Sequence, residues 1–547
     1  MRTALAILLT LLLTCSTTAQ WSTDPNNNLI VGYGLLPELC SDSAGGAYIA
    51  YENSTTYPRT IELRRLNRYG YQPWDSARQI RGLLPQSSNA RITEDGRNGV
   101  LIVFSDVYWF GPEQPVIERL RVQRVDSSGN ILWGPNGVRV TLSETNEGNA
   151  GIVCAGGGGC VIAWIDTLEN LRAQRFDTTG VRVWGDSGIV ISSGISPGPY
   201  VPLMAKVYPS YFCVGYSSTI FSLTSTVQKI DLDGNLLWAS GSTVDFLLMN
   251  MEDDYSGGVI CSGRIAFGSN ASICAQRIGP DGERLWLSPF LTLSDTATLN
   301  NAGVPIGVSN DGGAVFCWIK QIRDSTQVVA QRVASQGAIL WGAGGARVSR
   351  SNFSHLIPRM LSSSGGGNIF MWTDGRSPKG FYAQRLDSTS QPSWDTTDVA
   401  ISIRSGNEAS MQIISDGAGG SIAAWYEEPT FAILAQQVNR YGSLGEIILS
   451  VNKPSFRLVP AQAYLDQNYP NPFNNITTIR YEVFQSSFIR LDILNLLGQQ
   501  IHVVAHKPHQ PGVYEIRYDA SSLSTGVYLY RMMAENSVQL RKFIVLK

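Results

Sequence analysis

Side chains that exchange protons near neutral pH are scarce in this chain and poorly placed for catalysis. Of the four histidines, His502, His506 and His509 lie close to the C-terminus, and His355 has no serine or aspartate at a spacing that names a catalytic partner. Carboxylates are spread over many expected loops, and glycosidase chemistry needs two of them at a set separation that sequence spacing cannot test. We therefore predict no catalytic residue, and a non-enzymatic role is favoured over an enzymatic one.

Metal and cofactor sites are not predicted either. The segment DLDGN (Asp231–Asn235) imitates the start of a calcium loop, but it lacks the glutamate that closes an EF-hand loop. Comparable positions elsewhere in the chain read DSSGN and DTTGV, so we interpret the segment as a turn. The absence of a CxxC pair argues against a zinc site or a thioredoxin-type redox role.

The N-terminus has the features of an export signal. Residues 1–19 combine Arg2, an apolar run and small residues before a cleavage site after Ala19. An alternative is a lipoprotein, because the sequence before Cys15 weakly resembles a lipobox. No later segment is long and apolar enough to be a transmembrane helix.

Seven cysteines remain after cleavage at this site. Export permits disulfides, and the pairs Cys154/Cys160 and Cys261/Cys274 each flank a short expected hairpin. Buried free thiols are an equally good interpretation. Charged residues make up 16% of the chain and the formal net charge is −2, which argues against nucleic acid or an anionic membrane as the main partner.

A repeat explains most of the chain. A Gln-Arg pair, a small turn and a Trp recur at fixed distance, as in VQRVDSSGNILW (Val122–Trp133) and AQRFDTTGVRVW (Ala173–Trp184). The tryptophans that share this frame are 48 to 59 residues apart, at Trp74, Trp133, Trp184, Trp238, Trp286, Trp341 and Trp394. Each unit offers a Gly-rich turn and four short alternating strands. A period near 50 with this content predicts the blades of a β-propeller.

The count of blades follows from one missing and one extra Trp. Ten residues after Gln436 the eighth unit has Glu446 instead of Trp, whereas Trp21 lies one period before Trp74. We predict a ring of eight blades in which Leu29–Tyr33 pairs with the blade formed by residues 409–440. The rival prediction uses residues 446–451 as the closing strand. That rival leaves the N-terminal run as an arm outside the ring. In the ring closed by the N-terminal strand, the eight tryptophans should fill the gaps between blades, with the Gln-Arg pair at the blade surface.

The pattern D-x-x-G-x-x-x-W, as in Asp126, Gly129 and Trp133, resembles the tryptophan-docking motif of quinoprotein-type eight-bladed propellers. In that family the Asp-to-Gly spacing is usually one residue longer. Some members bind pyrroloquinoline quinone, and the enzymes carry adjacent cysteines near it, which this chain lacks. We therefore predict no cofactor. The turn also resembles the sialidase Asp-box, but the spacing to Trp differs and no arginine triad can be placed.

After a proline-marked linker (453–465), residues 466–547 form a set of short strands with turns about every ten residues, which predicts a small β-sandwich. This segment resembles the type A C-terminal sorting domain of type IX secretion substrates. The residues that carry the resemblance are Asn468, Tyr469, Pro470, Asn471, Pro472, Phe473, Asn474, Gly526, Tyr528 and Tyr530. The resemblance implies handling by the type IX machinery, passage through the periplasm, and attachment to the cell surface or release.

The sequence thus predicts an all-β protein, with an eight-bladed β-propeller at 20–452 followed by a small C-terminal β-sandwich. The predicted function is an exported binding protein with a glycan or protein ligand on one propeller face. The alternative is a secreted carbohydrate-active hydrolase or lyase on the same scaffold. Clustered carboxylates with arginine or aromatic neighbours at the centre of the ring would favour the enzyme.

Overall fold

The computed structural model describes residues 21–53, 57–109, 116–195, 201–207, 210–219, 222–265, 271–287, 289–297, 303–309, 312–363, 367–394, 397–404, 406–445, 463–466, 468, 470–471, 473–483, 486–495, 499–534 and 537–547. The predicted signal peptide, Ala19 and Glu446 lie outside these residues. The chain divides into two compact units, Met1–Ile447 and Ile448–Lys547. The described residues form strands and turns, and no helix among them is able to cross a membrane.

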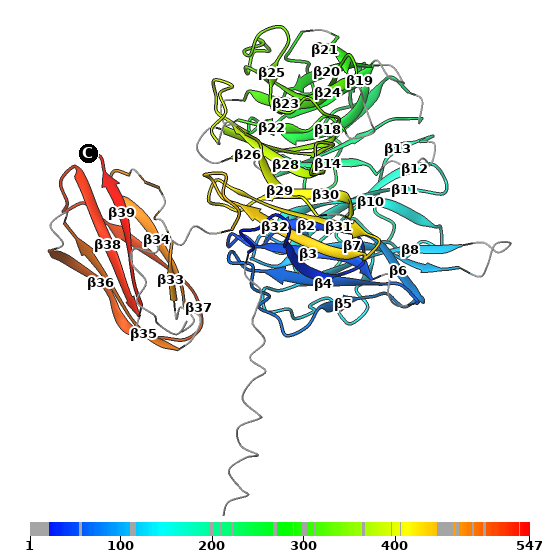
Figure 1. Cartoon of the computed structure of the whole chain (residues 1–547). Coiled ribbons are helices and arrows are strands. Elements are labelled where there is room, and N and C mark those ends of the chain that lie inside the picture. The colour runs from blue at the N-terminus through cyan, green and yellow to red at the C-terminus, as the bar shows by residue number, and fades with distance from the viewer. Residues whose placement is uncertain are drawn as a thin grey trace, which may run out of the picture. The chain divides into compact units, whose positions relative to one another are not determined.

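The first unit consists of four-stranded antiparallel sheets, which we number 1 to 8 (Figure 1). Sheet 1 holds β2 (Leu35–Ser41), β3 (Ala47–Asn53), β4 (Thr60–Leu66) and β5 (Arg78–Ile80). Sheet 2 holds β6 (Gln86–Glu94), β7 (Val100–Tyr108), β8 (Ile117–Val125) and β9 (Val138–Arg139). Sheet 3 holds β10 (Glu147–Gly156), β11 (Gly159–Asp166), β12 (Asn170–Phe176) and β13 (Ile189–Ser193). Sheet 4 holds β14 (Leu203–Val207), β15 (Tyr211–Tyr216), β16 (Ser225–Ile230) and β17 (Ser242–Val244).

Sheet 5 holds β18 (Leu247–Asp253), β19 (Val259–Ile265), β20 (Ala271–Ile278) and β21 (Leu291–Ala297). Sheet 6 holds β22 (Ile306–Val308), β23 (Ala314–Ile322), β24 (Ser325–Val333) and β25 (Ala346–Arg347). Sheet 7 holds β26 (His355–Ser363), β27 (Gly367–Asp374), β28 (Gly380–Leu386) and β29 (Val399–Ser402). Sheet 8 holds β30 (Asn407–Ser415), β31 (Ser421–Glu428), β32 (Ala432–Val438) and the N-terminal strand β1 (Leu29–Tyr33).

The second strand of each sheet is an almost unbroken apolar run. All seven residues of β3 are buried, as are the first five of β31, because both faces of these strands are covered. The largest fully buried side chains of this unit lie on such strands, at Trp164, Trp318, Trp372 and Trp425. These four tryptophans lie outside the repeated frame that predicts the docking tryptophans.

Apolar clusters join each sheet to the next. One cluster combines Tyr48 of sheet 1 with Phe104 of sheet 2, and the series continues to a cluster that joins Phe381 of sheet 7 to Trp425 of sheet 8. A further cluster joins sheet 8 to sheet 1 through Leu29 and Ile49. The first strands of consecutive sheets also contact one another, including β30 with β2. The packing contacts of the eight sheets therefore form a closed cycle.

The predicted closing strand is confirmed. β1 pairs with β32 in antiparallel register, with Leu29 opposite Ala435 and Tyr33 opposite Ala432. The pairing covers an edge of β32 that sheet 8 would otherwise leave open. The rival closing segment, 446–451, lies outside the described residues.

The second unit has two sheets around one apolar cluster. β33 (Ala463–Leu465), β34 (Ile476–Val483) and β37 (Gly512–Asp519) form the first sheet. β36 (Gln500–His509), β35 (Ser487–Leu494), β38 (Gly526–Ala534) and β39 (Ser537–Val545) form the second. Ile479 and Tyr481 of the first sheet pack with Leu491 and Tyr530 of the second.

Candidate functional site

The repeated Trp and the repeated basic residue meet at one acceptor. At the junction of sheets 5 and 6, the Trp286 indole N–H and the Arg277 guanidinium donate to the same carbonyl, that of Ser335, at 2.9 and 3.0 Å. The same double contact occurs at the junction of sheets 3 and 4, where Trp184 and Arg175 donate to the Leu232 carbonyl. Each Trp thus fixes its own sheet to the turn of the following one.

The ten-residue spacing between Gln and Trp has a hydrogen-bonding cause. The Gln174 side-chain oxygen accepts the backbone N–H of Trp184 at 3.0 Å, and its amide donates to the Gly185 carbonyl at 2.6 Å. Gln276 holds Trp286 in the same way. We expected the Gln at the blade surface, and this was wrong: Gln174 and Gln276 are completely buried, because their amides clamp the chain that carries the Trp.

The glycine of each turn provides room for the preceding Trp. Gly180 has φ +86°, and a Cβ added there would lie 2.9 Å from the Trp133 ring. Gly70 lies on Trp21 in the same way. A side chain at these positions would displace the Trp of the preceding repeat. This explains why a Gly recurs in such turns, four residues before the Trp of its own repeat.

Trp21 takes the place of the missing Trp of sheet 8. Its indole N–H donates to the Arg68 carbonyl of sheet 1 at 2.7 Å, and Gln436 of sheet 8 donates to the Ser22 carbonyl at 2.6 Å. Seven of the predicted docking tryptophans are only 4–8% exposed, namely Trp21, Trp74, Trp133, Trp184, Trp238, Trp286 and Trp394. Trp341 is only partly buried.

The residues of the sorting motif tie the start of the second unit to its last strands. Tyr530 donates to the Asp466 carbonyl and accepts the Asn468 N–H at 2.7 Å. Asn471 accepts the Ile544 N–H at 2.9 Å, and Phe473 packs on Phe543. Tyr528 stacks on the same Phe543, Pro470 accepts from Asn468 and Thr477, Gly526 begins β38, and Asn474 is exposed. Tyr469 and Pro472 lie outside the described residues.

All cysteines of the described residues are buried free thiols. Cys154 and Cys160 are direct cross-strand neighbours, whereas Cys261 lies opposite Gln276 rather than Cys274. Burial raises the pKa of the Cys261 thiol, which suppresses the reactive thiolate. Of the two alternatives that the sequence left open, the structure contains free thiols.

The turn interpretation of Asp231–Asn235 is confirmed. The Asp231 carboxylate accepts the backbone N–H groups of Asp233 and Asn235 at 2.9 and 2.8 Å. No group of three or more His, Cys, Asp or Glu side chains suited to a metal ion occurs within the described ranges.

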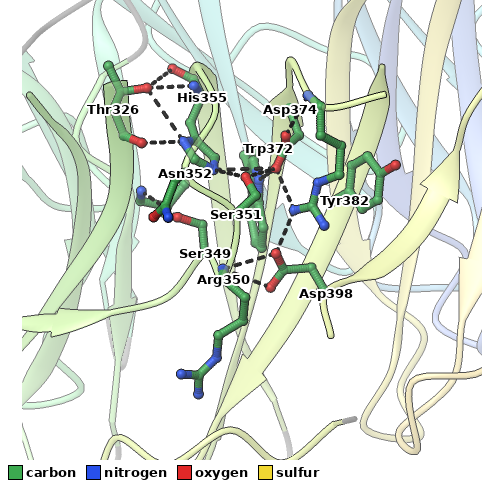
Figure 2. A network of polar contacts seen from close by, with 12 residues as sticks. Thr326, Ser349, Arg350, Ser351, Asn352, His355, Trp372, Asp374, Tyr382 and Asp398 are labelled. Carbon is green, nitrogen blue, oxygen red and sulfur yellow. Dashed lines mark hydrogen bonds and ion pairs between the residues drawn. The ribbon is translucent and has the colours of Figure 1, made fainter. Parts of the chain in front are cut away.

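His355 has the partners that the sequence did not reveal (Figure 2). Its Nε2 lies 3.0 Å from Ser351 Oγ and 3.3 Å from Asp374 Oδ2, and its Nδ1 contacts the Thr326 carbonyl. Asp374 is the register partner of His355 on the neighbouring strand. The statement that His355 lacks a serine or aspartate partner was therefore wrong, because the partner on β27 is brought close only by strand pairing.

Asp374 connects this histidine to further charges. Arg376 forms ion pairs with both Asp374 and Asp398, and its guanidinium lies 4.0 Å above the Tyr382 ring. Burial opposes ionisation of Asp374, but hydrogen bonds from His355 and Arg376 outweigh it and hold the pKa of Asp374 well below its usual range.

The three residue types of a catalytic triad are present, but their arrangement differs from one. In a triad the carboxylate accepts from Nδ1 while Nε2 faces the serine. Here Nδ1 is used by the Thr326 carbonyl, and Asp374 lies on the Nε2 side with the serine. His355 and Asp374 are both completely buried. The network therefore ties sheet 6 to sheet 7, and the Ser351 hydroxyl donates to Asp374 at 2.9 Å instead of standing in triad geometry.

A separate hollow of about 750 Å³ is called the Arg404 hollow. Its polar lining comes from the N-terminal segment and from loops and strand ends of sheets 7 and 8: Asn26, Lys379, Arg404, Asn407, Glu427, Glu428 and Thr430. Arg404 binds Glu427 at 2.6 Å and donates to the Asn26 carbonyl at 3.2 Å. The hydrogen bond from Arg404 lowers the pKa of Glu427.

Glu408 is the cross-strand neighbour of Glu427. Burial, assisted by the charge of Glu427, raises the pKa of Glu408 to about 7, although Ser402 donates a hydrogen bond to it. Two neighbouring carboxyl groups with pKa values shifted in opposite directions are the usual signature of an acid and a base.

The first strands of the sheets answer the question about clustered carboxylates. Glu38 on β2 binds Arg91 of β6 at 3.0 Å, and the charge of Arg359 on β26 also acts on Glu38. Each of these residues follows a β-bulge, which re-aims the side chain. Glu38 is thus a carboxylate with arginine neighbours on two other first strands.

Sequence reasoning did not find Arg404, Glu427 or Glu408. Each lies on an ordinary loop or strand end with no motif around it. The departures of sheet 4 from the repeat, described below, were readable in the sequence and were overlooked.

Comparison with known proteins identifies the C-terminal region. Residues 467–546 match the family model of the secretion system C-terminal sorting domain. A search of curated proteins finds no match. Among solved structures, PorZ, an essential bacterial surface component of the type IX secretion system of Porphyromonas gingivalis, is 11% identical. That match covers 93% of this chain and 70% of PorZ, with a TM-score of 0.33.

Two carbohydrate-active enzymes are also similar at low level. An ulvan lyase of polysaccharide lyase family PL25 is 9% identical over 79% of this chain and 98% of its own, with a TM-score of 0.42. A putative exo-β-1,3-galactanase from Bifidobacterium bifidum is 12% identical; the match covers 46% of this chain and 89% of the galactanase, with a TM-score of 0.23. These values are too low to carry an argument about function. The sorting domain, in contrast, marks the protein for export through the type IX secretion system to the cell surface or the extracellular space.

Proposed function

We propose that the protein is an exported eight-bladed β-propeller that binds a glycan outside the cell. The sorting domain carries the extracellular part of this proposal. The closed cycle of sheet contacts, together with the pairing of β1 with β32, supports the propeller. In this view residues 20–452 are the propeller and 466–547 are the type A sorting domain.

The Arg404 hollow supports glycan binding. It offers hydrogen-bond donors and acceptors, including Lys379, Asn407 and Thr430, and side chains of both charges. Its volume of about 750 Å³ suits a small oligosaccharide. The ion pair between Arg404 and Glu427 fixes the central polar groups before a ligand arrives, which lowers the entropic cost of binding. A hydroxyl-rich ligand can satisfy such a mixed set without bringing a net charge.

One observation favours the alternative, a carbohydrate-active hydrolase or lyase. Glu408, with a pKa of about 7, would supply a proton, and ionised Glu427 would act as base. Against this, Glu427 is nearly completely buried and held by both Arg404 and Thr430. Binding is therefore the better supported function.

The test uses the full exported protein on an array of immobilised glycans. Binding should weaken at least tenfold in Lys379→Ala combined with Asn407→Ala, because both side chains line the hollow and are exposed. The matched control is Lys206→Ala, an exposed lysine on β14. Absence of glycan binding by the wild type would contradict the proposal. Glycan cleavage that is lost in Glu408→Gln would establish the enzyme alternative instead.

Export is tested separately by deleting residues 466–547. The two units have separate apolar clusters, so the first should fold without the second. We expect a folded protein retained in the periplasm, measured by fractionation and protease resistance. Appearance of the truncated protein in the medium at the wild-type level would show that the sorting domain does not direct export.

A further inference from the structure

A second hollow, which we call the Lys229 hollow, lies at the junction of sheets 4 and 5. Its volume is about 740 Å³, and its walls include Tyr211, Lys229, Trp238, Tyr255, Pro280 and Asp281. Nothing in the repeat requires a hollow at this place. The residues around it depart from the repeat at three positions, and each departure can be measured against the other sheets.

The first departure is Tyr211. It directly precedes the residue that pairs with Ile230, and in the other seven sheets this position is glycine: Gly46, Gly99, Gly159, Gly258, Gly313, Gly367 and Gly420. A Cβ at Gly46 would lie 2.1 Å from the Leu66 carbonyl and 2.8 Å from the Asp42 carboxylate. Sheet 4 has Val207 where sheet 1 has Asp42, and in place of glycine it carries a large aromatic ring.

The second departure is Lys229, which replaces the arginine that follows the repeated Gln. In sheet 5 that arginine, Arg277, binds Asp254 at 2.9 Å. Lys229 is 4% exposed and forms no ion pair with any described residue. Its ammonium group donates to the Gly257 and Pro280 carbonyls at 2.7 and 3.0 Å and lies 4.4 Å from the centre of the Tyr211 ring. Sheets 3, 6 and 7 also lack the acid, with Ala155, Ser309 and Ser363 in its place, so the departure of sheet 4 is the cation on an aromatic face.

The third departure is Tyr255 of sheet 5, on the opposite wall. It follows the turn aspartate, a position filled by Ser43, Gly96 and Gly417 in sheets 1, 2 and 8. The backbone there is left-handed, with φ +56° at Tyr255. A bulky residue is strained in this conformation, and its ring is 54% exposed, so burial does not compensate for the strain. Leu36 and Phe431 have the same backbone conformation and are also exposed, so the conformation alone does not mark a site; at Tyr255 it coincides with the wall of a hollow.

We propose that the Lys229 hollow binds one sugar ring of a glycan. Tyr211 and Tyr255 supply flat apolar surfaces for the C–H face of a pyranose. Asp281 and Ser256 supply an acceptor and a hydroxyl group for the sugar hydroxyls. The site rests on glycan binding as the proposed function, but it lies at a different junction from the Arg404 hollow, and different variants abolish each.

The test measures binding of methyl β-glucopyranoside and methyl β-glucuronide to the full exported protein by titration calorimetry, with sodium acetate as the control anion. At least one pyranoside should bind saturably and acetate should not. Tyr255→Asn should weaken this binding at least tenfold, and asparagine suits the left-handed backbone, so the fold should be kept. Tyr441→Asn is the matched control, because Tyr441 is 70% exposed on a turn of sheet 8.

Three results would overturn the proposal: acetate binding as tightly as either pyranoside, equal binding by Tyr255→Asn and the wild type, or no binding of either pyranoside at millimolar concentration. Loss of array binding in the Lys379→Ala and Asn407→Ala variant with retained pyranoside binding separates the two hollows. A melting curve of each variant confirms that lost binding is not lost folding.

Discussion

Two neighbouring junctions of the same repeat are built from different chemistry. Between sheets 5 and 6, Trp286 and Arg277 meet the Ser335 carbonyl, and Asp254 neutralises the arginine. Between sheets 4 and 5, Trp238 and Lys229 meet the Pro280 carbonyl, but the acid is missing and a hollow opens. The acid is not general to the repeat, because sheets 3, 6 and 7 have Ala155, Ser309 and Ser363 at the position of Asp254. The feature that sets sheet 4 apart is the Lys229 ammonium against the Tyr211 ring.

The largest effect is expected where the two junctions agree, at the tryptophan. Replacing Trp286 or Trp238 with Ala should each lower the free energy of unfolding by about 3–5 kcal/mol, because both rings fill the gap between sheets. The same loss is expected for Trp184→Ala, and a smaller one for Trp341→Ala, since Trp341 is only partly buried. Urea unfolding of the exported protein measures this. A loss near zero at Trp286 would mean that the Trp does not hold the sheets together.

The second largest difference between the two junctions should be the loss of stability when an acidic residue is neutralised. Asp254→Asn leaves Arg277 buried without a counter-charge and should cost about 3 kcal/mol. Asp281→Asn at the Lys229 hollow is the control: Asp281 is exposed and forms no ion pair with the residues that the structure describes, so the change should be close to zero. Equal losses in urea unfolding would show that Asp281 stabilises the junction of sheets 4 and 5 as much as Asp254 stabilises the junction of sheets 5 and 6.

Some features of the structure could be predicted from the sequence and others could not. The closing pairing of β1 with β32 followed from the spacing of Trp21 and Trp74, because a repeat converts sequence distance into position. The partner of His355 did not follow: Asp374 is brought near by strand register, which spacing alone does not give. The Arg404 hollow was equally hidden, since its polar residues come from loops far apart in the sequence. The change from Arg to Lys229 was visible in the repeat, but only the structure shows that the Lys229 ammonium lies against the Tyr211 ring.

Lys229 itself should be less important for stability than its arginine counterpart. Its ammonium group donates to two carbonyls but compensates no charge, so Lys229→Met should cost about 1 kcal/mol in urea unfolding. Arg277→Met, which leaves Asp254 buried without its cation, is the matched comparison and should cost about 3 kcal/mol. A loss at Lys229 as large as that at Arg277 would mean that the hollow is a strained variant of the regular junction.

The smallest effect concerns pH and again compares two places. Desolvation of the carboxyl group, assisted by the charge of Asp253, raises the pKa of Glu252 on β18 to about 7, and desolvation raises that of Glu408 to the same value. The ordinary pKa of both groups is 4.5, so the folded state binds the proton more tightly than the unfolded state. The stabilisation is therefore complete below pH 4.5 and is lost as pH rises toward 7.

The size of each pH effect depends on how far the carboxyl group is exposed to solvent. Glu408 is partly buried, and its share should be about 1 kcal/mol; Glu252 is exposed, and its share should be no more than about 0.3 kcal/mol. Urea unfolding at pH 4.5 and pH 7.5 measures both: Glu408→Gln should flatten the fall in stability clearly, and Glu252→Gln only slightly. If Glu252→Gln flattened it more, Glu252 would be the better shielded of the two carboxyl groups, and sheet 5 rather than sheet 8 would hold the dominant proton-binding group.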